Sequence, residues 1–105
     1  MIVADIRAVP VGTGTSLSRY IKAIHKMLDD EGVSYLPGPM STAVEVETLD
    51  ELMGIVDLTN QVLVDMGVQR MLTTINIDYR LDKEISIESK IEATEPELKE
   101  HIRSK

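Results

Sequence analysis

The residues best suited to chemistry in this chain are charged and polar side chains that alternate with apolar ones along short extended segments. Alternation puts every second side chain on the same face of a strand. In a sheet with strand order 4-1-3-2, the segments carrying Asp5, Glu45 and Asp78 are neighbours, so these carboxylates would lie close together. When partly desolvated, such groups must pair with one another or with a ligand. The set comprises Asp5, Arg7, Glu45, Glu47, Thr74, Asn76, Asp78 and Arg80.

Two interpretations of this polar set stay open. An interface network would join Arg7 to Asp78 or Glu45, and the residue spacing favours it. In the same network Arg80 would pair with an acid of a second copy. A polar ligand pocket made of the same groups is the sharper alternative. Nothing in the sequence distinguishes Glu45 and Asp78 from structural carboxylates as an acid–base pair.

A glycine-rich loop, Gly12-Thr13-Gly14-Thr15-Ser16, precedes the first predicted helix. Backbone amides and hydroxyls in such a loop can bind an anion. No Lys follows the glycines, and the loop lacks the dinucleotide-binding spacing. The sequence therefore favours a strand-to-helix turn that ends in a helix N-cap.

Catalysis and metal binding have little support in the sequence. The chain has no Cys, and Ser16 and Ser18 have no nearby base to activate them. His25 lies among charged residues of the first predicted helix and His101 lies in the C-terminal tail. Neither has the spaced partners of a metal site, so both are expected on the solvated surface. We predict a protein that is not an enzyme, with no catalytic residue, metal or cofactor.

Composition narrows the classes of partner. A net charge of −7 disfavours nucleic acid, because binding to a phosphate backbone needs clustered Lys and Arg. Three Tyr without Phe or Trp leave few platforms on which bases could stack. Charges follow Met1 too early for a signal peptide, and no apolar run approaches the length of a membrane span. We expect a cytoplasmic protein with no nucleic-acid or membrane partner.

Apolar periodicity predicts the elements that position these residues. Alternation predicts strands over residues 2–10, 42–47 and 71–82, with a short extended piece over 33–36. Helical spacing predicts one helix from Leu17 to Gly32, and a second from a capping box at Thr48 and Glu51 to Gly67. The charged segment after residue 82 has too few apolar residues for core packing. It is expected to form one or two peripheral helices.

The order of elements is the βαββαβ order of a ferredoxin-like α+β sandwich. We predict a single domain over residues 1–105, with a core over 1–82 and a charged helical tail over 83–105. Both helices would cover one face of a four-stranded antiparallel sheet. The other face mixes Val9 and Leu72 with charges, so a second copy is expected to cover it in a homodimer or homotetramer. Coverage by the chain's own C-terminal segment would remove a site between copies.

Three stretches, taken in order and spacing, resemble the thiamine-binding protein family, long grouped as an uncharacterised protein family and related to YkoF-like proteins. They are Ile6 to Thr13 with Ser18 and Tyr20, Met40 to Glu45 before Leu49 to Met53, and Gln69 to Lys83. The resemblance extends from Met1 to about Ile91. It implies a ferredoxin-like subunit that forms dimers and usually tetramers. It also implies binding of thiamine or a related pyrimidine, with no established catalysis.

The resemblance assigns candidate binding residues. The family's Pro-x-Gly-Thr pattern falls on Pro10, Gly12 and Thr13, and its Thr before a Glu falls on Thr42 and Glu45. The pattern of the last strand falls on Arg70, Thr73, Thr74, Asp78 and Arg80. Ser41 and Val46 stand where many relatives carry Gly, which narrows the approach of a ligand to the backbone. The predicted ligand-binding set is Asp5, Arg7, Gly12, Thr13, Ser18, Tyr20, Thr42, Glu45, Thr74, Asp78 and Arg80.

The chemistry of thiamine is compatible with these residues. Glu45 is the candidate for the aminopyrimidine edge, and Asp78 or Asp5 would balance the thiazolium charge. Tyr20 or Tyr79 could offer an aromatic face, although alternation points Tyr79 toward the helices. A phosphorylated relative would instead use Arg7, Arg80 and the loop at Gly12 and Thr13. We predict a non-catalytic small-molecule-binding protein that binds thiamine or a related pyrimidine at a subunit interface. The alternative is a structural or interaction homo-oligomer whose polar sheet face is only an assembly surface.

Overall fold

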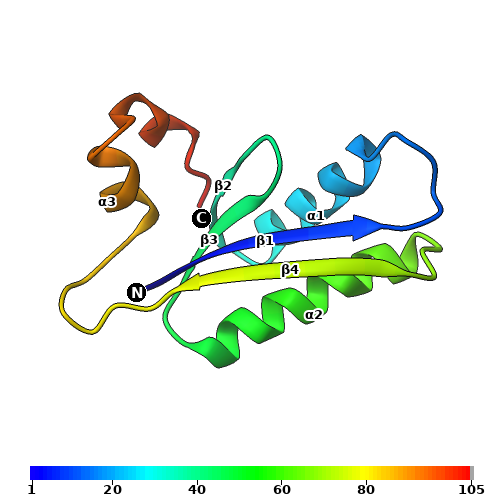
Figure 1. Cartoon of the computed structure of the whole chain (residues 1–105), viewed down its shortest axis with the longest axis horizontal. Helices are drawn as coiled ribbons and strands as arrows, with labels where there is room; N and C mark the ends of the chain where they lie inside the picture. Colours follow the sequence, from blue (N-terminus) through cyan, green and yellow to red (C-terminus); the bar gives the residue numbers. More distant parts are fainter. Residues whose placement is uncertain (105) are drawn as a thin grey trace.

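Four antiparallel strands form one sheet in the order β2-β3-β1-β4, and the two long helices cover one of its faces (Figure 1). The computed structural model describes residues 1–104. The elements are β1 (Ile2–Pro10), α1 (Ser18–Asp30), β2 (Ser34–Pro37), β3 (Thr42–Val46), α2 (Leu49–Asp65), β4 (Met71–Asp78), α3 (Ile87–Glu92) and a 3-10 helix, η1 (Pro96–His101). The predicted α+β ferredoxin-like class and strand order are therefore confirmed.

The main core lies between the sheet and the two long helices. Alternate β1 residues Ile2, Ala4 and Ile6 point into it, and α2 adds Leu52 and Leu63, both fully buried. A Leu→Ala change at such a site costs about 2–5 kcal/mol, so this core sets most of the stability of the fold. Across residues 1–104, no helix combines the length and apolar content that crossing a bilayer requires.

The helix ends agree with the sequence prediction at three of four places. Gly32 and Gly67 follow α1 and α2 with φ of 70° and 88°, the left-handed conformation that glycine adopts at low cost. At the start of α2, the Thr48 hydroxyl accepts from the Glu51 amide at 3.1 Å, while the Glu51 carboxylate accepts from the Glu47 amide. The predicted side-chain cap of the first helix is wrong: its N-cap is Leu17, which has no capping side chain.

The last strand is shorter than the sequence predicts. The expected strand reaches residue 82, whereas β4 ends at Asp78, which pairs with Val3 near the start of β1. Because β1 has almost no chain beyond that pair, the next residues have no partner strand. Tyr79 is 56% exposed, so the prediction that its side chain faces the helices is wrong.

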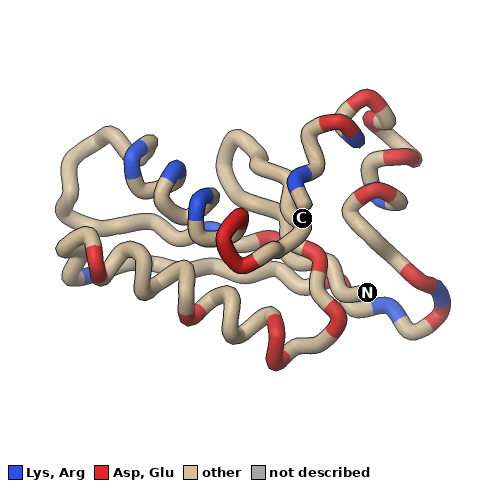
Figure 2. Tube along the Cα trace, turned by 180° about the vertical axis from the view of Figure 1, so that it is seen from behind, with Lys and Arg blue, Asp and Glu red and all other residues tan. Residues whose placement is uncertain are grey.

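The C-terminal segment, residues 84–104, packs on the sheet face opposite the long helices, at the end near the N-terminus (Figure 1). Ile85 and Ile87 are buried against Val3, with Ala43 and Ile102 beside them. The prediction that this segment lacks packing residues is therefore wrong. Figure 2 shows that acidic positions predominate along it, while basic positions line the exposed side of α1.

The C-terminal segment also pairs with the outer edge of the sheet. The backbone amides of Tyr35 in β2 and Arg103 each donate to the other's carbonyl at 2.8 Å. This bridge covers the β2 edge, whereas β4 forms the other edge of the sheet. The C-terminal segment therefore covers the sheet edge at β2 and does not cover the edge at β4 within residues 1–104.

Candidate functional site

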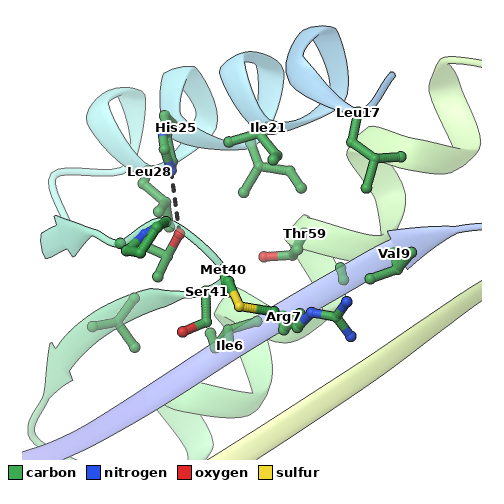
Figure 3. A pocket seen from close by; sticks show the side chains of 16 residues that line it. Ile6, Arg7, Val9, Leu17, Ile21, His25, Leu28, Met40, Ser41 and Thr59 are labelled. Atoms are coloured by element: carbon green, nitrogen blue, oxygen red, sulfur yellow. Dashed lines mark hydrogen bonds between the residues drawn. The ribbon is translucent and has the colours of Figure 1, made fainter. Parts of the chain in front are cut away.

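A cleft of about 200 Å³ lies between α1, β1 and the β2–β3 loop (Figure 3). Leu17, the N-cap of α1, and Ile21 of α1 face β1 across it, and Met40 of the loop closes one side. Most of the lining side chains are apolar, as in small-molecule sites generally. The lining residues are Ile6, Arg7, Ala8, Val9, Leu17, Ile21, Ile24, His25, Leu28, Gly38, Pro39, Met40, Ser41, Thr42, Val44 and Thr59.

The cleft exists because β3 is shorter than β1. The pairing of β1 with β3 ends at Ile6 and Thr42, although β1 continues to Pro10 beside β4. The chain turns away through Gly38, whose amide donates to the Ser41 carbonyl at 2.9 Å. A Cβ atom at Gly38 would lie 2.7 Å from that carbonyl oxygen, so the tight turn requires glycine. The second half of β1 therefore borders a cleft instead of a strand.

His25 and Thr42 form the polar contact inside the cleft. His25 Nε2 lies 3.2 Å from Thr42 Oγ1, and the His25 ring lies 5.4 Å from the ring of Tyr35 (Figure 3 shows the first contact). The Tyr35 hydroxyl donates to Asp29 at 2.7 Å. The prediction that His25 is a solvated surface residue is therefore wrong. Its position four residues after Ile21, in the apolar stripe of the helix, was the available signal.

The surroundings of His25 favour the neutral form of its ring by lowering its pKa. Burial lowers the pKa of His25 most, the Arg103 charge lowers it further, and Asp29 raises it in part. Among the described residues that line the cleft, Arg7 is therefore the one with a charged side chain at neutral pH. Hydroxyl groups of Ser41, Thr42 and Thr59 supply the remaining side-chain polarity.

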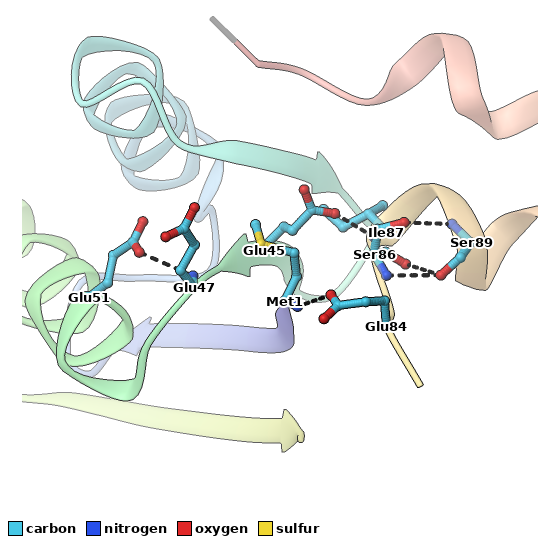
Figure 4. Close-up of polar contacts among 8 residues, drawn as sticks. All are labelled: Met1, Glu45, Glu47, Glu51, Glu84, Ser86, Ile87 and Ser89. Atoms are coloured by element: carbon cyan, nitrogen blue, oxygen red, sulfur yellow. Dashed lines mark hydrogen bonds and ion pairs between the residues drawn. The ribbon is translucent and has the colours of Figure 1, made fainter. Parts of the chain in front are cut away.

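Two of the predicted carboxylates hold the C-terminal segment. Glu45 Oε1 accepts from the Ile87 amide at 2.8 Å, and Asp78 forms an ion pair with Lys90 (Figure 4 shows the first). The N-terminal amine pairs with Glu84 at 2.7 Å beside them. α3 begins at a capping box of Ser86 and Ser89. The structure thus brings these predicted residues together at one end of the open sheet face, around the chain's own tail.

The remaining predicted residues are dispersed. Asp5 accepts from the Ser41 hydroxyl at 2.6 Å, and Arg80 pairs with Asp82 beyond the end of β4. Arg7 and Thr74 lie opposite each other across β1 and β4 on the uncovered part of the open face, and Arg7 also borders the cleft at the free edge of β1. From the predicted set, Arg7 and Thr42 are the two residues that line the cleft.

The loop before α1 contributes less than its composition suggests. Gly12 and Gly14 both have positive φ, 83° and 93°, and so shape the turn. The Thr13 hydroxyl is buried with no hydrogen-bond partner within residues 1–104. Ser18 is exposed, whereas Tyr20 is 2% exposed in the core, with its hydroxyl accepting from Arg19. Tyr20 is therefore a packing residue with no face free for a ligand.

A second, wider cleft of about 550 Å³ lies on the other side of the same loop, against the C-terminal segment. Asp5 and Ala43 form its floor on the open sheet face. Its outer wall is made of exposed side chains, including Glu100 and His101, so it shields a ligand from water less well than the smaller cleft. No group of three or more potential metal ligands lies together in the described part of the chain.

Fold and cleft together define a ferredoxin-like α+β domain with a mostly apolar cleft beside its first strand. A Methanocaldococcus jannaschii protein of solved structure is similar, with a TM-score of 0.78 and 31% identity over 90% of this chain and 96% of its own. A Thermotoga maritima structure has a TM-score of 0.74 and 26% identity over 88% and 96% of the two chains. That protein has been assigned, as a hypothesis, to thiamine biosynthesis or salvage.

Sequence comparison places the chain in a family. The UPF0045 protein YqgV of Bacillus subtilis is 36% identical, over 93% of this chain and 98% of its own. A UPF0045 protein of Methanothermobacter thermautotrophicus is 35% identical, over 93% and 100%. The family described as thiamine-binding protein matches residues 4–95, and the chain belongs to it. The resemblance inferred from the three sequence stretches is therefore confirmed.

Proposed function

We propose that this protein binds thiamine or a related pyrimidine in the cleft between α1 and β1, without turnover. The observation that carries the proposal is the cleft itself, an apolar slot with one neutral polar contact, in a chain of the thiamine-binding family. A flat aromatic ring fits such a slot, because its faces meet apolar side chains while its edge meets a few polar groups. The proposed site therefore lies within one chain, not between copies.

The two ends of thiamine differ in what they require. The pyrimidine is neutral and suits the inner cleft, where His25 is held neutral and no carboxylate lines the wall in the described part of the chain. The thiazolium is cationic and belongs in solvent at the mouth, because burying an unpaired charge is costly. The net charge of −7 favours the approach of a cation to the chain as a whole. A phosphorylated relative would place its phosphate near the exposed Arg7 guanidinium.

Binding without turnover is supported by the state of the His25–Thr42 contact. A histidine that activates a hydroxyl nucleophile is normally oriented by a third group on its other ring nitrogen. No side chain within residues 1–104 bonds to Nδ1 of His25. Product formation from thiamine or its phosphates during a long incubation would contradict this part of the proposal.

Isothermal titration with thiamine tests the site when paired with a variant that fills it. Ile21 lines the cleft and is 42% exposed, so Ile21→Trp places a bulky indole ring there with little strain on the core. We expect affinity to fall at least about tenfold. Met53→Trp is the matched control, because Met53 is 44% exposed on α2 away from the cleft. Absence of binding by the wild type, or equal affinity in both variants, would contradict the proposal.

Homo-oligomer formation is the second part of the proposal. The C-terminal segment leaves part of the open face uncovered, where Leu72 is 55% exposed beside the β4 edge, which has no partner strand within residues 1–104. Pairing with a second copy would bury both features. Sedimentation of the wild type and of Leu72→Lys tests this: we expect an oligomer that the variant weakens. A wild-type monomer at micromolar concentration would contradict it.

A further inference from the structure

Ala8 of β1 lies in the cleft and has no partner residue on β3. The register of β1 with β3 pairs Ala4 with Val44 and Ile6 with Thr42, so the next pair along would be Ala8 with Met40. Met40 instead belongs to the turn closed by the Gly38–Ser41 hydrogen bond. Ala8 lines the cleft with no hydrogen-bond partner for its amide or carbonyl on that side, in residues 1–104.

The direction of these two groups follows from the hydrogen-bond parity of β1. In an antiparallel sheet both backbone groups of one residue point to the same neighbouring strand, and the direction alternates along the chain. The Val11 amide donates to the Arg70 carbonyl, so odd-numbered residues of β1 point toward β4. Ala8 is even-numbered and points the other way, toward the cleft.

Ala8 therefore presents a donor and an acceptor side by side at the edge of an apolar slot. Buried backbone groups are almost always hydrogen-bonded, so a half-covered pair in a cleft favours a ligand with the complementary pattern. A ring nitrogen next to an amino group supplies that pattern: the nitrogen accepts from the Ala8 amide, and the amino group donates to the Ala8 carbonyl. Leu17, at the N-cap of α1, and Ile21 would cover one face of the ring.

We propose that the free backbone edge of β1 at Ala8 recognises the amino-substituted edge of a pyrimidine, in the position where β3 would have continued. This assignment rests on the proposed function and specifies which part of the ligand is read. The sequence predicted that the Glu45 carboxylate binds the aminopyrimidine edge. In this proposal the Ala8 amide and carbonyl bind that edge instead. Glu45 itself is engaged by the Ile87 amide on the opposite face of the sheet.

Ligand analogues test the assignment on the wild-type protein. Oxythiamine carries an oxo group and a ring N–H in place of the amino group and ring nitrogen, so it presents the reversed pattern. Pyrithiamine keeps the aminopyrimidine and replaces the thiazolium by a pyridinium. We expect isothermal titration to give similar dissociation constants for thiamine and pyrithiamine, and at least about tenfold weaker binding of oxythiamine.

Amide hydrogen exchange gives a second readout with an internal control. With saturating thiamine, exchange of the Ala8 amide should slow at least about tenfold, while the Val9 amide, which faces β4, should change little. Equal affinity for thiamine and oxythiamine, or an unprotected Ala8 amide, would overturn the assignment and leave the proposed function standing. Failure of all three compounds to bind would overturn both.

Discussion

The two faces of the sheet differ in what they contact: one binds the C-terminal segment of the chain, and the other borders the candidate cleft. The face opposite the long helices carries the carboxylates Glu45 and Asp78, and both hold the C-terminal segment in place. The cleft on the helix side carries no carboxylate in the described part of the chain, yet it has the enclosed, mostly apolar walls of a ligand site. The charged face thus binds the C-terminal segment, and the helix-covered face borders the candidate site.

The polar residue types singled out in the sequence and the candidate cleft lie mostly in different places, because the cleft depends on the relative lengths of β1 and β3. A charged side chain on a sheet can be neutralised by a distant segment of the same chain, as Lys90 does for Asp78. In this molecule a cleft lies where β1 extends beyond β3 after Ile6, between α1 and the β2–β3 loop. Backbone groups freed in this way are available to a ligand whatever the side chain.

The largest expected effect is the undocking of the C-terminal segment from the sheet. Ile87 is 2% exposed in the small cluster with Val3, so Ile87→Ala should destabilise docking of the C-terminal segment by about 2 kcal/mol or more. Hydrogen exchange at the Arg103 amide measures this, because that amide is bonded to Tyr35. Thiamine affinity should change less than about threefold, and Leu81→Ala, at a position 90% exposed, is the control. Loss of thiamine binding together with undocking of the C-terminal segment would place the ligand site on the open face and not in the cleft.

A smaller effect is expected from the polar contact in the cleft. Thr42→Val keeps the shape of the side chain but leaves His25 without its partner, so thiamine affinity should fall about fivefold. Thr74→Val makes the same chemical change on the opposite face, where Thr74 is exposed, and should leave affinity unchanged. Titration calorimetry on both variants sharpens the contrast. A greater loss in the Thr74 variant would favour the open face.

The Glu45 carboxylate provides a test with a still smaller expected effect. Glu45→Gln keeps a neutral acceptor for the Ile87 amide, so tail docking should weaken by less than about 1 kcal/mol. Thiamine affinity should stay within about twofold, since Glu45 does not line the cleft. The measurement is titration alongside hydrogen exchange at Ile87. A large drop in affinity would restore Glu45 as the ligand-binding residue.

The pH dependence of stability distinguishes the two histidines. Burial and Arg103 lower the pKa of His25 in the native state, whereas the unfolded chain takes up the proton near 6.5. Its contribution to stability is therefore present above pH 6.5 and is lost as the pH falls from there through the lowered pKa. Urea denaturation at pH 7.5 and 5.5 should show a smaller difference for His25→Gln than for the wild type. His101→Gln is the exposed control, and an equal change in both variants would contradict this account.

The sequence predicts the framework of the molecule well, because that framework depends on local patterns. Alternation in β1 separates helix-facing positions from outward ones, with Ala4 buried and Arg7 exposed, and the glycines at 32 and 67 end the helices as expected. The burial of Ile85 and Ile87 was missed because their partners on the sheet are far away in the chain. The cleft was missed because it depends on the relative lengths of two strands and on backbone groups at Ala8, which residue types do not reveal.

The most direct test of where the ligand binds is a titration of labelled protein with thiamine, followed by amide chemical shifts. We expect the largest shift changes on Ala8, Ile21 and Thr42, which line the helix-side cleft. We expect small changes on the sheet face that the C-terminal segment covers. Largest changes at Glu45 and Ile87, with little response at Ala8, would contradict this prediction.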